Sequence, residues 1–135
     1  MLQSVTAYLF TVVFFLALDY VWLARLAKGF YIKRLGELLL PTPRFGIAAL
    51  FYIVYVVGIV IFAVTPALRE GSMATAALYG ALFGFFAYAT YDITNYATLR
   101  DWPLAVAIVD IAWGTVLTGL SAVVGYLAAE HLIQA

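Results

Sequence analysis

The sequence predicts an all-α, multi-pass integral membrane protein, a bundle of four transmembrane helices that forms a single domain over residues 1–135. Two observations lead to this prediction. Of the 135 residues, 67% are hydrophobic and only 10% are charged, whereas soluble domains carry about 25% charged residues. In addition, four apolar runs lie between the charged residues, each long enough to cross a hydrocarbon core of roughly 30 Å.

The four runs cover residues 5–26, 46–64, 74–98 and 103–128. Short connections rich in proline and glycine separate them, as antiparallel neighbouring helices require: Pro41 and Pro43, then Pro66 with Gly71, then Asp101-Trp102-Pro103. The first run has no basic segment before it and contains Asp19. We therefore expect it to be a retained helix and not a cleaved signal peptide.

Basic residues are distributed unequally over the connections, and this distribution predicts the topology. Arg69 stands alone in the second connection, whereas five basic residues flank the first: Arg25, Lys28, Lys33, Arg34 and Arg44. Because short cytoplasmic loops carry the excess of lysine and arginine, the first connection is expected in the cytoplasm and both termini on the extracytoplasmic side. Residues 28–40 mix apolar and charged side chains, which suits either a short interfacial helix or a plain basic loop.

Three aspartates lie at one depth within the predicted helices. Asp19 precedes the end of the first helix at Leu26 by seven residues, Asp92 precedes Leu99 by seven, and Asp110 follows Pro103 by seven. At the rise of an α-helix, each lies about 10 Å inside the cytoplasmic boundary. Because a carboxyl group facing lipid is costly, we expect all three to point into the bundle, paired or protonated, with at least one neutral near pH 7.

Aromatic and polar side chains accompany the acids at this depth and complete a candidate ligand-binding set. Two of the acids belong to a repeated Asp-x-x-Trp motif, Asp19 with Trp22 and Asp110 with Trp113. Gly80 and Gly84 form a G-x-x-x-G pair that permits close helix packing, and Trp102 is interpreted as an interfacial anchor. The predicted ligand-binding residues are Asp19, Trp22, Tyr52, Tyr55, Tyr88, Tyr91, Asp92, Asn95, Asp110 and Trp113.

The segment YATYDITNYATLRDWPLAVAIVDIAWG, from Tyr88 to Gly114, is similar to the signature of a bacterial family of small four-helix membrane proteins, domain of unknown function 2177. The most specific elements are Tyr91-Asp92, Thr94-Asn95, Ala97-Thr98, Trp102-Pro103, and Asp110 with Trp113-Gly114. Asp19 with Trp22 fits the first helix of that family, so the resemblance runs nearly end to end. It implies a protein of the bacterial inner membrane and contributes no activity.

Several kinds of chemistry find no support in the sequence. The absence of cysteine removes disulfides and thiolate sites, one histidine makes no metal or haem site, and no cofactor fingerprint is present. Seven basic residues balance seven acidic ones, which gives no reason to expect a nucleic-acid partner. We expect no cofactor and no metal, and the partners expected are membrane lipids, a small ligand and a second copy of the chain in a homodimer.

Three functions remain open. The first is binding or transport of a small cationic, amphipathic or lipid-like molecule in an aspartate-lined and aromatic-lined cavity open to the cytoplasmic half of the bilayer, coupled to proton exchange. The second is a membrane-embedded acid-base enzyme acting on a lipid or isoprenoid, with Asp19, Asp92 and Asp110 as the catalytic candidates. The third is an accessory subunit of a larger membrane complex.

Overall fold

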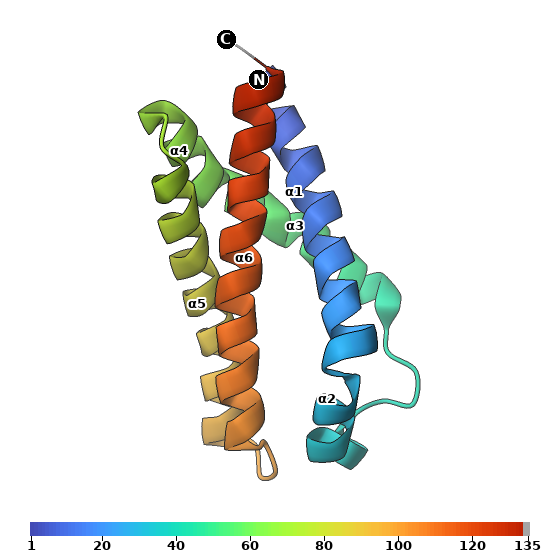
Figure 1. Ribbon diagram of the computed structural model, residues 1–135. Helices are drawn as coiled ribbons and strands as arrows, with labels where there is room; N and C mark the ends of the chain where they lie inside the picture. Colours follow the sequence, from blue (N-terminus) through green and yellow to red (C-terminus); the bar gives the residue numbers. More distant parts are fainter. Residues whose placement is uncertain (134–135) are drawn as a thin grey trace.

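The computed structural model describes residues 1–133, which are helical apart from short connections and contain no strand. Four helical stretches are long and apolar enough to cross a membrane: Leu2–Leu26, Phe45–Glu70, Met73–Thr98 and Leu104–Leu132 (Figure 1). The predicted all-α class with four transmembrane helices is therefore confirmed. Its elements are α1 (Leu2–Val21), η1 (Trp22–Leu26), α2 (Lys28–Leu35), η2 (Gly36–Leu38), α3 (Phe45–Ile59), η3 (Val60–Val64), α4 (Thr65–Glu70), α5 (Met73–Thr98) and α6 (Leu104–Leu132).

Helix α6 is the centre of the bundle and packs against both α5 and α1 (Figure 1). Most of its buried side chains are small, among them Gly114, Ala122 and Gly125, so neighbouring backbones can approach closely. Helix α3 lies against α1, and η3 contacts α1, α5 and α6. The N-terminus and the last turn of α6 lie at one end of the molecule, and α2 and the α5–α6 connection lie at the other (Figure 1).

The G-x-x-x-G pair of α5 packs closely against α6. A Cβ added to Gly80 would lie 2.7 Å from the Cβ of Ala122, and one added to Gly84 would collide with the carbonyl oxygen of Gly114. The ring of Tyr88 in turn covers Gly114. Because any side chain at these glycines would force α5 and α6 apart, the pair fixes their separation.

The second span does not end near Val64, where Pro66 suggested a boundary, but continues through α4 to Glu70. The reason is a π-helical turn, η3, directly before the proline. In this turn the Thr65 amide donates to the carbonyl of Val60, five residues earlier. The widened turn displaces the hydrogen-bond register just before a residue that has no N–H to donate, so the helix passes the proline without a break.

Residues 28–35 form a helix, α2, so the helical alternative for the first connection is the correct one. Ala27 leaves helical geometry at φ −118° and separates α2 from the π-helical end of the first span. Leu35 of α2 is buried and Tyr31 is half-buried. The short helix therefore packs against the bundle, which places its side chains beside those of α6.

Candidate functional site

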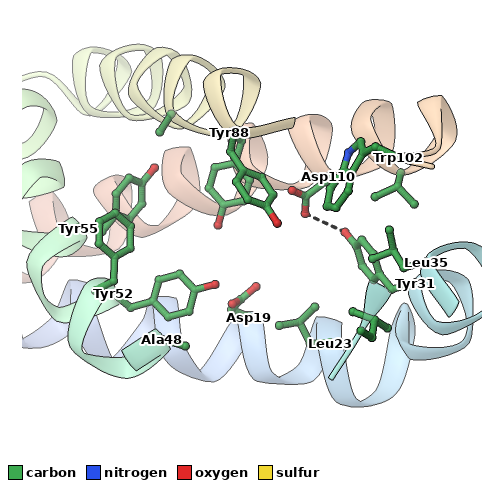
Figure 2. A pocket seen from close by; sticks show the side chains of 15 residues that line it. Asp19, Leu23, Tyr31, Leu35, Ala48, Tyr52, Tyr55, Tyr88, Trp102 and Asp110 are labelled. Atoms are coloured by element: carbon green, nitrogen blue, oxygen red, sulfur yellow. Dashed lines mark hydrogen bonds between the residues drawn. The ribbon is translucent and has the colours of Figure 1, made fainter. Parts of the chain in front are cut away.

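A cavity of about 570 Å³ lies between α1, α2, α3, α5 and α6 (Figure 2). Two aspartates, Asp19 and Asp110, face it from opposite helices, and neither lysine nor arginine is among the described residues that line it. The lining residues are Asp19, Leu23, Tyr31, Leu35, Leu39, Ala48, Phe51, Tyr52, Tyr55, Ala87, Tyr88, Tyr91, Trp102, Val106 and Asp110. The cavity is thus acidic at two points and otherwise apolar or phenolic.

Asp19 is held by a hydrogen bond from the opposite helix. The indole Nε1 of Trp113 donates to its Oδ1 at 3.0 Å, and the hydroxyl of Tyr52 points toward the same carboxyl group (Figure 2). The side chain is only 6% exposed, so these donors replace water around it. Hydrogen bonds to an ionised acceptor are stronger than neutral ones, and this arrangement therefore suits a carboxylate at Asp19.

Asp110 is held by a residue of α2. The Tyr31 hydroxyl donates to Asp110 Oδ1 at 3.0 Å (Figure 2). It also accepts from Trp22 Nε1 at 3.2 Å, which gives a chain of indole, phenol and carboxyl. Burial raises the pKa of the Tyr31 phenol above its usual range, and the negative charge of Asp110 raises it further. Tyr31 therefore stays neutral at physiological pH and remains a donor.

The two Asp-x-x-Trp motifs interlock. Trp22 and Trp113 stack at a centroid distance of 4.3 Å with an interplanar angle of 7°. Because α1 and α6 run in opposite directions, each indole of the pair points to the other helix: that of Trp113 to Asp19 directly, and that of Trp22 to Asp110 through Tyr31. The two antiparallel motifs therefore position each other's carboxyl group, Asp19 directly and Asp110 by way of Tyr31.

Asp92 differs from the other two acids. It is 0% exposed, it does not line the cavity, and neither carboxyl oxygen has a hydrogen-bond partner among the described residues. Two polar groups act on it, the carboxyl of Asp110 and the indole of Trp102, whose Nε1 also lacks a partner. The fully buried carboxyl of Asp92 thus pairs with the half-buried carboxyl of Asp110, behind the cavity wall.

Over residues 1–133, no group of three or more histidine, cysteine, aspartate or glutamate side chains lies close enough to hold a metal ion. Asp92 pairs with Asp110, and Asp19 faces Asp110 across the cavity.

Comparison with known families assigns the chain as a whole. Residues 4–127 match the profile described as "Predicted membrane protein (DUF2177)". The chain belongs to the DUF2177 family. The DUF2177 match covers both Asp-x-x-Trp motifs and Asp92, and it agrees with the resemblance drawn from Tyr88–Gly114. Neither the curated proteins nor the solved structures compared with the chain include a match.

Six of the ten residues predicted to bind a ligand line the cavity of this DUF2177 protein: Asp19, Tyr52, Tyr55, Tyr88, Tyr91 and Asp110. The other four do not. Trp22 and Trp113 form the stacked brace beside it, Asp92 is buried behind Asp110, and Asn95 lies near Tyr91, outside the lining.

Two aromatic residues, Trp102 and Tyr31, line the cavity although the sequence did not predict them as ligand-binding residues. Trp102, expected only as an interfacial anchor, lines the cavity and meets the Tyr91 ring edge to face at 5.6 Å. Tyr31 lies in the connection and gave no depth signal, because its position depends on how α2 folds back. The amphipathic pattern of residues 28–40 was the one available hint, but it predicted only an interfacial helix or a basic loop, and not that this segment packs against the bundle.

Proposed function

We propose that the cavity binds a small cationic amphipathic molecule, as a binding or transport site in the cytoplasmic half of the bilayer. One observation carries the proposal. Two carboxyl groups, Asp19 and Asp110, face a largely apolar cavity with no lysine or arginine in its described lining. Its volume of about 570 Å³ lies within the range typical of small-molecule sites.

Charge supplies the selectivity. Trp113 and Tyr31 donate to the two carboxyl groups without neutralising them, so negative potential remains directed at the cavity. A unit positive charge about 4 Å from a carboxylate gains about 4 kcal/mol at an effective dielectric constant of 20. An aromatic face adds about 0.5 to 2 kcal/mol by cation–π attraction. The acids therefore select the charge, and the rings select the shape.

The phenol rings form the apolar walls of the site. Tyr52 and Tyr55 of α3 and Tyr88 and Tyr91 of α5 line the cavity together with the two acids. Their rings offer contact area to a hydrophobic cation or to the headgroup of a cationic amphiphile. Tyr55 is further held by a 3.0 Å hydrogen bond between its hydroxyl and that of Thr118.

Part of the lining is itself exposed on the outer surface, which gives an amphiphile a way in. Leu23, Leu39 and Phe51 line the cavity and are 46%, 40% and 60% exposed, respectively. They come from η1, from the α2–α3 connection and from α3. In a bilayer these side chains face acyl chains, so an apolar tail can leave between them while its charged head stays beside the acids.

The distribution of basic residues supports the orientation. The cavity lies toward the end that carries α2 and the α5–α6 connection, away from the termini (Figure 1). Arg25, Lys28 and Arg100 belong to this end, whereas Arg69 lies at the other. In a bacterial inner membrane, this charge excess faces the cytoplasm.

Equilibrium binding of two ions of the same shape tests the proposal. Purified protein in nanodiscs is titrated with tetraphenylphosphonium or with tetraphenylborate, and protein-free nanodiscs give the background. We expect saturable binding of the cation alone, weakened about tenfold or more by Asp110→Asn because one near carboxylate is lost. Asp101→Asn, in the exposed α5–α6 connection, is the matched control. Equal binding of both ions would refute the proposal.

A membrane-embedded acid-base enzyme is the second candidate, and the buried carboxyl pair favours it. A protonated Asp92 directly behind an ionised Asp110 would pair an acid with a base that lines an aromatic cavity, so that a proton would reach a substrate by way of Asp110. Turnover separates the two functions. If the protein is an enzyme, lipid extracts from wild-type cells and from a deletion strain should differ in composition. Cells that carry Asp110→Asn should then have the lipid composition of the deletion strain.

A further inference from the structure

Asp92 is the one of the three acids that has no hydrogen-bond partner among the described residues. Two of the three acids receive hydrogen bonds, Asp19 from Trp113 and Asp110 from Tyr31, whereas both oxygens of Asp92 are without a partner in the described chain. An ionised carboxylate left unpaired in a membrane interior costs several kcal/mol. A neutral carboxyl group avoids this cost and gains an O–H donor.

The carboxyl of Asp110 is the charged acceptor beside Asp92. Asp110 on α6 faces it, Tyr31 of α2 and Tyr91 of its own helix are the other titratable side chains that interact with it, and Trp102 presents an N–H donor. No basic side chain is among these described neighbours. Since Tyr31 engages Oδ1 of Asp110, the second oxygen of Asp110 can accept a hydrogen bond from a protonated Asp92.

We infer that Asp92 and Asp110 share one proton and that this proton is released when the cation binds, so that the site exchanges one proton for one positive charge. The inference rests on the cation site proposed above. On binding, the O–H bond of Asp92 breaks, and the proton passes by way of Asp110, which lines the cavity, to water. The Asp92–Asp110 pair then carries one more negative charge, and the positive charge of the bound cation balances it.

The stoichiometry of one follows from the hydrogen bonds. Asp19 and Asp110 have donors that stabilise their ionised forms, so Asp92 alone has a proton to release. Asp92 does not line the cavity and would not touch the ligand. It acts as a positioning residue that couples binding to protonation through Asp110. By linkage, affinity for the cation should rise with pH, by at most about tenfold per pH unit.

Calorimetry in paired buffers tests this coupling. Tetraphenylphosphonium has no dissociable proton, so any proton taken up by the buffer comes from the protein. Its binding to wild-type protein is titrated at one pH in two buffers of different ionisation enthalpy, and the difference in heat counts the protons released. We expect one proton for each cation. Asp92→Asn should still bind the cation but release none, and its affinity should no longer depend on pH.

Two further measurements separate the coupling from a packing defect. Asp92→Glu keeps an acid at this position and should restore proton release. In wild-type protein alone, the infrared carbonyl band of a protonated carboxyl should be present at neutral pH and should disappear when the cation is added. If the wild type does not bind the cation, the proposed function fails. Binding without proton release, or release that persists in Asp92→Asn, overturns the coupling while the binding site stands.

Discussion

Trp22 and Trp113 stack on each other yet donate to different acceptors, and this difference separates their roles. Trp113 donates directly to the Asp19 carboxyl, whereas Trp22 donates to the Tyr31 hydroxyl, which in turn holds Asp110. Loss of the first hydrogen bond leaves a buried acid short of a donor. Loss of the second leaves Asp110 with its phenol donor intact, so the two indoles should contribute unequally.

Trp113→Phe should destabilise the protein by about 1 to 2 kcal/mol, because it removes a hydrogen bond to a charged group within the membrane. Trp22→Phe is the matched control. It also keeps a ring in the stack but removes a bond to a neutral hydroxyl, and it should cost about 0.5 kcal/mol. Equilibrium unfolding in denaturing detergent measures both. Equal losses would show that ring packing, and not the carboxyl contact, determines the effect.

The repeated motif was readable in the sequence, but its interlocking was not. Spacing placed Asp19, Asp92 and Asp110 at one depth, and the structure pairs Asp110 with Asp92 and puts Asp19 across the cavity from it. Spacing along a helix does not specify which residue of another helix lies opposite. The exchange of partners between the two Asp-x-x-Trp motifs depends on the register of α1 against α6, and Tyr31 entered the site from a connection whose fold the sequence left open.

At the scale of the helices, the separation of α5 and α6 depends on Gly84. A Cβ at this position would collide with the Gly114 carbonyl and lie 2.6 Å from the Thr118 Cβ, so the backbone itself must move. Gly84→Ala should therefore destabilise the protein by about 1 to 3 kcal/mol, as overpacking does. Gly46→Ala is the control, since nothing lies within 4 Å of its added Cβ. The same unfolding assay applies, and similar values for both variants would contradict the close approach.

Helix α2 is attached to the bundle partly through the Tyr31 hydroxyl, and this attachment should be sensitive to alkali. Burial, and after it the negative charge of Asp110, raises the pKa of Tyr31 in the folded protein above the usual tyrosine value of about 10. Above pH 10 the unfolded chain loses this proton while the folded chain keeps it, so the free energy of unfolding falls as pH rises.

Tyr31→Phe should make that alkaline loss of stability shallower, because the variant has no phenol to ionise at this position. Unfolding measured at successive pH values from neutral upward checks this expectation. Tyr20→Phe, a change at a 67% exposed tyrosine of α1, should leave the slope unchanged. Identical slopes for Tyr31→Phe and the wild type would show that Tyr31 is not a site of this coupling.

The helix ends show where sequence patterns stop being informative. Four apolar runs predicted the four spans because each must cover the bilayer core, which is a property of composition alone. The extent of the second span depended instead on η3, a local change in hydrogen-bond register that carries the helix past Pro66 to Glu70. Nothing in an apolar sequence such as VIFAV marks a π-turn, so this boundary could be found only from the folded chain.

For the whole molecule, the position of the cavity in the membrane depends on which end faces the cytoplasm, and the chain is well suited to testing this because it has no cysteine. Thr42→Cys places a thiol in the α2–α3 connection at the cavity end, and Met73→Cys places one at the exposed start of α5 at the other end. If the basic end is cytoplasmic, a membrane-impermeant maleimide should label Met73→Cys in intact spheroplasts and Thr42→Cys only after permeabilisation. The wild type gives the background in both conditions. The reverse pattern would place the cavity in the outer half of the bilayer, where a cation would arrive from outside the cell.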